Sequence, residues 1–467
     1  MGTLRKSSYL ISIKLDNSNQ YMLIHGYTGA IDIVDDNLKN YLQSDTIITD
    51  DSFPYSNETL KQLKERGYLT TKSKEEEYAY VKKVANILHK RNKMSVKSFT
   101  LLVTYDCNFR YPYCYEKEVL NKVSEKSHII ISKDMVDNFY SKIAEIEPIE
   151  KLRNKTINLF GGEPLLKENR EIIDYILQKG QKSGYVFTAT TNGYDLIFYE
   201  DYLNKDYING IQITIDGSQS MHDSRRIHFS DHKSFNRIIE NIKMALNKGI
   251  TVNVRINIDN NNINELSKLE NYFDEIGLYS FENFNVYAAF ISGGVNFIPS
   301  TEVENTSSMN KKITQRDFLH IFKNNRLHIK HDIPLFLNLQ NAITKGKAMR
   351  LTPCYCNAQD SSFAFDPFGY IYSCLEVVGN KEKSIGSYKK DLEWNTTKDV
   401  WFNRNSGNIN RCSKCKYALI CGGGCFTKTF TSKDSIDSYC DDFSIIIKNV
   451  ANEVYALLKN EQKINIY

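Results

Sequence analysis

The first 106 residues contain no cysteine, and no run of 18 apolar residues occurs anywhere in the chain. Because a transmembrane helix needs about 20 apolar residues, we expect neither a membrane span nor a membrane partner. The N-terminal stretch MGTLRKSSYLISIKLD has an apolar run shorter than that of a secretory signal, and no small-residue cleavage site follows it. These absences predict a cytoplasmic protein.

An excess of either charge is also lacking, since 60 basic residues stand against 56 acidic ones and the net charge is +4. A nucleic-acid-binding protein would need a basic face or stripe, so no nucleic-acid partner is predicted. The 467 residues are too many for one hydrophobic core. The length predicts about three domains.

Residues 1–73 have the pattern of a small α/β domain. Alternating apolar and polar residues predict strands, and later stretches have helical spacing. The expected strands are 8–16 and 30–36, and the expected helices are 36–43 and 57–67. Residues 74–97 are expected to form a linker helix, whose mixed charges indicate a solvated face.

From residue 98 to residue 300, short apolar strands alternate with helical stretches. Six strands are expected, at 98–106, 156–161, 185–191, 211–216, 251–259 and 283–290. This alternation favours parallel strands joined by right-handed crossovers. The predicted fold class is therefore α/β, with a partial (β/α)6 barrel of the TIM type and a site at the carboxyl ends of its strands. A connector (301–350), a cysteine-rich domain (351–445) and a C-terminal helix (446–467) are expected to follow.

The ten cysteines are clustered, which favours metal ligation over disulfides in a chain without a secretory signal. Two of them are Cys107 and Cys114. The other eight are Cys354, Cys356, Cys374, Cys412, Cys415, Cys421, Cys425 and Cys440, enough for two four-thiolate sites. Soft thiolates favour zinc or iron–sulfur clusters. The glycines at 422–424 favour the bulkier cluster, because they let backbone approach an inorganic core, and a pair of zinc sites is the alternative.

These cysteine spacings resemble the SPASM domain, which binds two auxiliary [4Fe–4S] clusters in radical S-adenosylmethionine (radical SAM) enzymes that modify peptides. The resemblance assigns one cluster to four thiolates, those of Cys412, Cys415, Cys421 and Cys440. It assigns Cys374 and Cys425 to the other cluster, with Cys356 and Cys354. Whether both of these last two bind the same cluster is left open, because their spacing is narrower than in some relatives.

The segment FGGEP at 160–164 directly follows an expected strand. Gly161 and Gly162 suit a close backbone approach, and Glu163 supplies a carboxylate for a cationic amine. The segment is similar to the radical SAM motif that holds the amino group of S-adenosylmethionine. The resemblance also places Asp216, Arg255 and Asn257, which follow later in the segments TIDG and VRINID, toward the cofactor or substrate. Polar capping of strand ends is the alternative for these three.

The segment CNFRYPYCYEK at 107–117 resembles the radical SAM cluster loop, which has three cysteines where this chain has Cys107, Tyr111 and Cys114. A phenol has a pKa of about 10 against about 8.5 for a thiol, and it is a harder ligand. Three interpretations follow. Tyr111 is a sequence variant within a functional enzyme, it marks a pseudo-enzyme that retains peptide binding, or it serves as an atypical ligand.

Residues 1–73 resemble the winged-helix leader-recognition domain of the PqqD-like type, which would bind an extended leader along the strand at Ala30–Val34 opposite the helix at 57–67. The resemblance as a whole implies a radical SAM peptide maturase. Such an enzyme forms a 5′-deoxyadenosyl radical from S-adenosylmethionine and modifies, by crosslinking, a ribosomally made precursor peptide. An electron donor such as flavodoxin or ferredoxin is implied, and no residue is assigned to the catalytic step itself.

The sequence leaves three alternative functions. An anaerobic sulfatase-activating enzyme of the formylglycine-forming type ranks second, because such relatives have an acidic residue directly after the cysteine that matches Cys374. Here Leu375 stands in that place and Glu376 follows it. A leader-binding pseudo-enzyme and a zinc-binding structural protein are the other two.

Overall fold

The computed structural model describes residues 4–43, 53–114, 116, 129–259, 261–291, 328–329, 333–430, 437–440 and 443–460. The chain divides into two compact units, and neither is continuous in sequence. One unit comprises Met1–Met94, His331–Asp360 and Phe402–Tyr467, and the other comprises Ser95–Lys330 and Ser361–Trp401. We call them the N/C unit and the sheet unit. Most of the expected connector at 301–350 lies outside the described residues.

The sheet unit contains six parallel strands that are neighbours in the order of the chain. They are β6 (Lys97–Thr104), β8 (Arg153–Gly161), β9 (Val186–Thr191), β10 (Ile208–Thr214), β12 (Thr251–Ile258) and β13 (Phe284–Phe290). The six expected strands and the α/β class are therefore confirmed. Since all six run parallel, their carboxyl ends meet at one edge, where the loops carry Cys107, Glu163 and Asp216.

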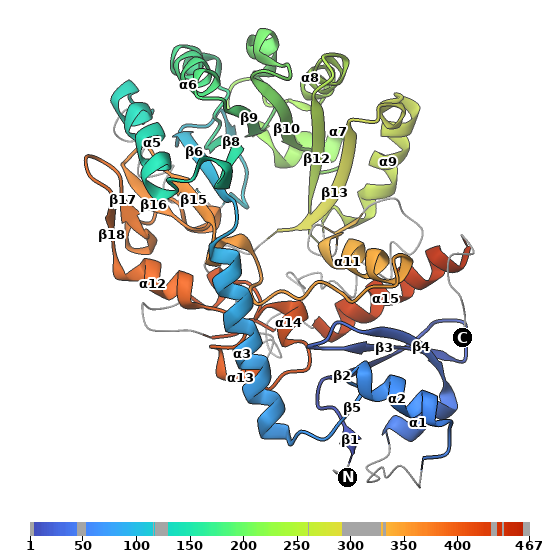
Figure 1. Cartoon of the computed structure of the whole chain (residues 1–467). Coiled ribbons are helices and arrows are strands. Elements are labelled where there is room, and N and C mark those ends of the chain that lie inside the picture. Colours follow the sequence, from blue (N-terminus) through green and yellow to red (C-terminus); the bar gives the residue numbers. More distant parts are fainter. Residues whose placement is uncertain are drawn as a thin grey trace, which may run out of the picture. The chain divides into compact units, whose positions relative to one another are not determined.

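Four helices lie along the outer side of this sheet in Figure 1: α5 (Lys133–Ile146), α6 (Arg170–Lys182), α8 (Phe235–Asn247) and α9 (Leu266–Glu275). Each buries an apolar stripe at helical spacing, as Ile238, Ile242 and Ala245 do in α8. A 3₁₀ helix, η4 (Leu196–Tyr202), follows β9, and a short α-helix, α7 (Gln219–Arg225), follows β10.

The sheet continues beyond the six strands at both edges and does not close within the described residues. On one side β14 (His328–Ile329) pairs with β13. On the other side β15 (Ser362–Phe365) runs parallel to β6 and leads into three antiparallel strands, which are β16 (Tyr370–Tyr372), β17 (Gly386–Ser387) and β18 (Glu393–Trp394). Helix α12 (Thr396–Asn403) follows. Part of the cysteine-rich segment thus belongs to the same sheet as the six parallel strands.

The N/C unit is built on an antiparallel sheet of β2 (Leu10–Lys14), β3 (Gln20–His25) and β4 (Ile31–Asp35). One face packs against two helices from the C-terminal half of the chain, α11 (Ile333–Thr344) and α15 (Phe443–Asn460). The other face packs against α1 (Asp36–Gln43) and α2 (Asn57–Glu65) (Figure 1). A small pair, β1 (Arg5–Lys6) with β5 (Leu69–Thr70), completes this region.

Helix α3 (Lys74–Lys93) buries four residues at a spacing of four, which are Glu77, Val81, Ala85 and His89. The expectation of a charged helix with a solvated face is correct for its other sides only. The Glu77 carboxylate is fully buried and accepts hydrogen bonds from Arg5 at 2.6 Å, Ser7 at 2.5 Å and Tyr27 at 3.1 Å. None of the helices in the described part of the chain is long and apolar enough to cross a membrane.

Candidate functional site

Glu163 lies at the end of β8 with its side chain almost completely buried. Its carboxylate accepts hydrogen bonds from the Thr191 hydroxyl at 2.6 Å, the Asn192 N–H at 2.6 Å and the Leu165 N–H at 2.9 Å. Burial raises the pKa of Glu163 to about 7, although these hydrogen bonds oppose the shift. The TTNG segment after β9 thus positions the carboxylate that the sequence assigned to the cofactor.

The two glycines before Glu163 are required by a close approach of backbones. A Cβ on Gly161, whose φ is +129°, would lie 2.1 Å from the Thr104 carbonyl oxygen. A Cβ on Gly162 would lie 2.3 Å from the Asp106 carbonyl oxygen. The Glu163 N–H donates to that same Asp106 oxygen at 2.7 Å. The glycines therefore allow the backbone of the Glu163 loop to contact the backbone at the end of β6, in the residues that directly precede Cys107.

Cys107 begins the loop in which the sequence predicts the cluster ligands. The pKa of its thiol is raised to about 12, first by burial and also by the neighbouring Glu163 carboxylate and Cys114 thiol. Burial also raises the pKa of Cys114. Asn108 joins this loop to the next one, since it accepts a hydrogen bond from Asn192 at 2.7 Å. Both thiols and the Glu163 carboxylate thus lie close together at one edge of the sheet.

Tyr111 occupies the middle of this loop in an aromatic and cationic environment. Its ring centroid is 4.9 Å from that of Tyr113, and the Arg226 guanidinium lies 4.4 Å from the Tyr111 ring centroid. Burial holds the pKa of the Tyr111 phenol well above its usual value, so the phenol is neutral at physiological pH. Two thiols and a neutral phenol do not fit a cluster that needs three thiolates.

Asp216 lies at the end of β10, fully buried, and binds two partners that the sequence did not single out. The Tyr113 hydroxyl donates to its Oδ2, and Arg225 Nε lies 3.5 Å from the same oxygen. Arg225 also pairs with Asp259 at 3.0 Å. Asp216 therefore has an ion pair and a hydrogen bond within the protein.

Arg255 and Asn257, on β12, contact each other through a hydrogen bond of 2.8 Å from Arg255 Nε to Asn257 Oδ1. The Asn257 N–H donates to Asp216 Oδ1 at 3.4 Å. These contacts bring the three predicted residues Asp216, Arg255 and Asn257 together. Arg255 also lines a cavity, so it is the one of the three that faces open space.

That cavity has a volume of about 480 Å³. It is lined by polar side chains from successive parallel strands and by the segment after Cys374; among them are Asn158, Thr188, Thr190, Gln212, Asn253, Arg255 and Glu376. Alternate residues of one strand share a face, so this lining is one polar face of the sheet. The face offers amides, hydroxyls, a guanidinium and a carboxylate to a polar ligand such as a peptide backbone.

Four of the C-terminal cysteines gather in the N/C unit. The pKa of Cys421 is raised to about 12, first by burial and also by the neighbouring thiols of Cys412, Cys415 and Cys440. The pKa of Cys412 is raised to about 11, mainly by burial. These four residues are the set that the resemblance assigned to one cluster. Four neighbouring sulfur donors fit a four-thiolate site, whether for an iron–sulfur cluster or for zinc.

The glycines of the ICGGGC segment have a different immediate role from the one that the sequence suggested. Gly422, Gly423 and Gly424 all have φ between +72° and +88°. A Cβ on Gly422 would lie 2.3 Å from the Cys354 carbonyl carbon, and one on Gly424 would lie 1.8 Å from the Tyr439 carbonyl oxygen. The glycines thus let the loop contact the backbone beside two other cysteines, Cys354 and Cys440.

The second predicted set is divided between the two units, since Cys374 follows β16 in the sheet unit. In the N/C unit, Cys356 and Cys425 are neighbours. The pKa of Cys356 is raised to about 12, first by desolvation and also by the Cys425 thiol, while a hydrogen bond from the Ala358 N–H opposes the shift. Cys354 lies two positions earlier in the chain, in a different environment.

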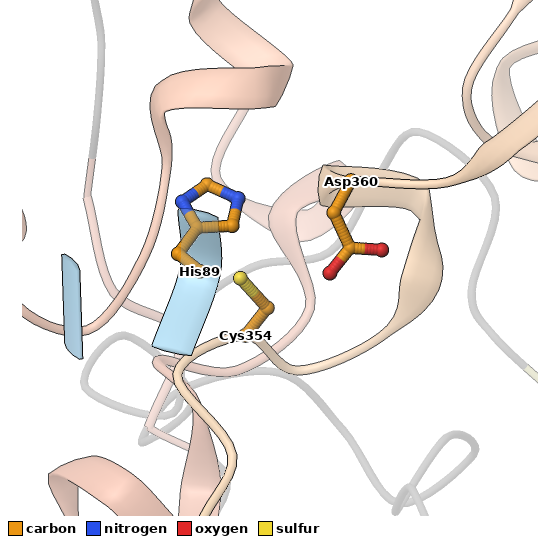
Figure 2. Close-up of side chains that lie close together, drawn as sticks. All are labelled: His89, Cys354 and Asp360. Carbon is orange, nitrogen blue, oxygen red and sulfur yellow. The ribbon is translucent and has the colours of Figure 1, made fainter. Parts of the chain in front are cut away.

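Cys354 is buried beside His89 and Asp360, and the three side chains point toward one another in Figure 2. Their ligand atoms lie within 4.8 Å of one another. Both ring nitrogens of His89, however, have protein partners. Nε2 lies 3.0 Å from the Gln359 carbonyl oxygen, and Nδ1 lies 3.0 Å from the Asn405 side-chain nitrogen. His89 is therefore bound as a neutral structural residue, and it does not complete a metal site with Cys354.

Several residues of the candidate site were missed from the sequence. Arg225, Arg226 and Tyr113 surround Tyr111 and Asp216, and the sequence singled out none of the three. The sequence feature that could have identified Arg225 and Arg226 is their position in HDSRRIH, shortly after the TIDG segment that contains Asp216. Their role depends on β7 (Phe109–Arg110) pairing with β11 (Ile227–His228), a two-residue ladder with no pattern of its own.

Comparisons with known proteins agree with this geometry. Residues 101–273 match the family model of the Radical SAM superfamily. A cysteine-type anaerobic sulfatase-maturating enzyme from Clostridium novyi (strain NT) is 22% identical over 377 residues, which are 77% of this chain and 97% of the relative. One from Clostridium perfringens (strain 13 / Type A) is 20% identical over 370 residues, 74% of this chain and 96% of the relative.

A solved structure, native anSMEcpe with bound AdoMet, has a TM-score of 0.56 at 18% identity and covers 78% of this chain and 99% of its own. The same protein with AdoMet and the Cp18Cys peptide has a TM-score of 0.55 at 17% identity, with coverage of 78% and 99%. At these identities the likeness shows a shared fold. The matched segment contains Cys107, Glu163 and Asp216, so residues 101–273 are similar to a radical SAM domain, which together with these relatives supports an enzyme of that kind.

Proposed function

We propose that this chain is a radical SAM peptide maturase that carries two auxiliary [4Fe–4S] clusters and has an incomplete radical-generating site. The observation that carries the proposal is the buried Glu163 carboxylate beside the Cys107 thiol at the carboxyl edge of the parallel strands. A buried carboxylate in this place suits the amino group of S-adenosylmethionine. No reaction step follows from the Cys107 loop as it stands, because Tyr111 leaves only two thiols there.

A peptide substrate is supported by two features. The cavity beside Arg255 is lined by amides and hydroxyls, which pair with a peptide backbone. In the N/C unit, β4 pairs only with β3 among the described strands, so its other edge offers a site for an extended leader. Residues 1–73 would thus serve as the leader-recognition domain, with α2 opposite the edge.

With a third thiolate in place of Tyr111, a [4Fe–4S] cluster that is reduced by a donor such as flavodoxin or ferredoxin would supply the 5′-deoxyadenosyl radical from S-adenosylmethionine. This chain's own residues would hold and orient the substrates. Glu163 would hold the amino group, and Arg255 and its neighbours would face the peptide in the cavity. Crosslinking of the precursor peptide is the product class that we propose.

The test is Tyr111→Cys in the full chain, reconstituted anaerobically beside the unsubstituted protein. We expect about eight irons in the unsubstituted protein and about twelve in the variant, from four per cluster. Only the variant should release 5′-deoxyadenosine from S-adenosylmethionine and a strong reductant. The double variant Tyr111→Cys/Glu163→Gln should keep the added iron and lose the cleavage.

Three outcomes would overturn parts of this proposal. Stoichiometric zinc without iron would reject the auxiliary clusters. Failure of Tyr111→Cys to gain iron or activity, with about eight irons retained, would favour a leader-binding pseudo-enzyme instead. If the unsubstituted chain cleaves S-adenosylmethionine at the rate of the variant, Tyr111 is a working ligand.

Sulfatase maturation is the second candidate, and Glu376 is the observation that favours it. The sequence ranked this function lower because Leu375, not an acid, follows Cys374. In the structure the Glu376 side chain nevertheless lines the cavity, so a carboxylate is available there. Incubation of Tyr111→Cys with a cysteine-containing sulfatase peptide distinguishes the two. Formylglycine formation that is lost in Glu376→Gln would favour this candidate over crosslinking.

A further inference from the structure

Arg404 is among the largest fully buried side chains of the protein, and it lies in the N/C unit between the cysteine segments. Its guanidinium donates only to backbone carbonyls. Nη1 donates to Gly424 at 3.0 Å, Nη2 donates to Gly423 at 2.8 Å, and both Nε and Nη2 donate to Asp437, at 3.2 and 2.7 Å. The group also lies 4.8 Å from the Phe426 ring centroid.

These contacts engage all three nitrogens of the Arg404 guanidinium and leave its positive charge without a counter-ion. No ion pair joins Arg404 to a carboxylate within the described residues. An arginine cannot lose its proton in a protein, and an uncompensated buried charge costs several kcal/mol. Some anionic group close to Arg404 must therefore balance it in the working state.

Sulfur is the anion that the surroundings offer. Four thiols interact electrostatically with Arg404, those of Cys412, Cys425, Cys356 and Cys354. These thiols come from both predicted cluster sets, Cys412 from one and Cys356, Cys425 and Cys354 from the other. Neutral thiols would leave the cation unbalanced, whereas metal-bound thiolates carry the required negative charge.

We propose that Arg404 is a positioning residue that supplies the shared positive charge between the two thiolate sites and raises the reduction potential of the clusters they hold. The proposal rests on the auxiliary clusters proposed above. A cation near a cluster stabilises its more negative, reduced state, so the midpoint potential becomes more positive. The same side chain fixes the Gly423–Gly424 loop to the Asp437 carbonyl, three residues before Cys440.

The two roles of Arg404, raising the reduction potential and fixing the Gly423–Gly424 loop, depend on different properties of its side chain. The potential depends on the charge, which lysine retains and glutamine removes. The loop contacts depend on the planar arrangement of donors, which lysine lacks. Arg411 provides a matched control because it precedes Cys412 directly, carries the same charge and is exposed, so solvent screens it.

The experiment compares the full-length protein with Arg404→Gln, Arg404→Lys and Arg411→Gln after anaerobic reconstitution. Iron and sulfide content are measured, and midpoint potentials are taken from redox titrations followed by electron paramagnetic resonance. We expect Arg404→Gln to lower the midpoint potential or lose iron. Arg404→Lys should keep iron with a potential close to the unsubstituted value, and Arg411→Gln should change neither.

An unchanged potential in Arg404→Gln with full iron would overturn the proposal. Loss of iron from both Arg404 variants would overturn the charge requirement, because a retained cation would not suffice. If Arg411→Gln lowered the midpoint potential as much as Arg404→Gln does, the proposal would also be wrong, because the burial of the charge would then have no effect. Zinc in place of iron in the unsubstituted protein would instead reject the proposed function, and the zinc content of the same variants would then test Arg404.

Discussion

The ring of Tyr111 lies within the Cys107–Cys114 loop, and its partners show why a single residue changes the chemistry there. Arg226 lies 4.4 Å from the ring centroid and donates to the Tyr113 hydroxyl at 2.9 Å. The cation is attracted to the aromatic face, while its charge opposes the rise in the pKa of Tyr111 that burial causes. The sequence identified Tyr111 as the departure from the three-cysteine pattern. It could not identify Arg226, because 115 positions separate the two residues.

Gly162 gives a prediction at the residue scale. In Gly162→Ala the new Cβ would lie 2.3 Å from the Asp106 carbonyl oxygen, a backbone atom that cannot move without displacing the start of the Cys107 loop. We expect a loss of about 1–3 kcal/mol in the free energy of unfolding, from overpacking. Urea unfolding followed by circular dichroism measures it.

Gly210→Ala is the control for that variant, because it lies in the same sheet and its Cβ would meet nothing closer than the Thr188 methyl at 3.4 Å. Its free energy of unfolding should change by less than about 0.5 kcal/mol, as is usual for a mild substitution. Equal losses in the two variants would mean that the contact with Asp106 does not constrain the loop.

At the scale of elements, hydrophobic pattern predicted the structure where a strand is long and buried. The six parallel strands have seven to nine residues except β9, which has six, and all bury apolar side chains. Strands β15–β18 have two to four residues each, too few for a period to be read. Their place in the sheet is fixed by β15 pairing with β6, about 260 residues earlier in the chain, which no local pattern encodes.

The register between β3 and β4 determines which backbone groups of β4 point away from β3. His25 N–H donates to Ala30 O, so the hydrogen-bonded pairs that follow are Leu23–Asp32 and Tyr21–Val34. Ile31 and Ile33 then point their backbone groups away from β3. Arg66 already donates to the Ile31 carbonyl. Ile33 is therefore the first residue of this edge whose backbone can pair with an added strand.

Ile33→Pro follows as the prediction at this scale. Proline removes the outward N–H of Ile33 without breaking a bond to β3, so the fold should persist while a leader peptide binds at least several-fold more weakly. Fluorescence anisotropy with a labelled leader peptide measures the affinity. Ile33→Ala, which loses similar packing but keeps the N–H, should bind more tightly than the proline variant. Equal affinities in the two would remove β4 as the leader site.

At the scale of the whole molecule, the chain's two ends form one core. Ile13, Met22 and Ile24 of the N-terminal sheet pack in the same cluster as Leu339 of α11 and Val450 of α15. The sequence predicted the strands at 8–16 and 30–36 and the C-terminal helix as separate patterns, and it did not predict β3 or α11. It could not predict the association of the two ends. An apolar pattern shows that a face of a helix or strand will be buried, but it does not show which other element will cover that face.

Polar contacts reinforce this association close to the cysteines. The buried Tyr9 hydroxyl donates to the carbonyl of Ser413, the residue after Cys412. Asn405, beside Arg404, contacts both Asn86 and His89 of α3. The N-terminal 94 residues thus support the segment that carries the predicted cluster ligands, in addition to their proposed role in leader binding.

Removal of residues 1–94 is therefore expected to do more than abolish leader binding. The truncation would expose the apolar faces of α11 and α15 and remove the partners of Ser413 and Asn405, each buried side chain lost costing about 2–5 kcal/mol. We expect the truncated chain to lose at least the four irons of the Cys412 set and to unfold at a lower temperature, as measured by iron analysis and calorimetry. Ile33→Pro separates the two roles, because it should weaken leader binding with iron unchanged. A truncated chain that keeps about eight irons and its unfolding temperature would show that residues 1–94 are an independent appendage.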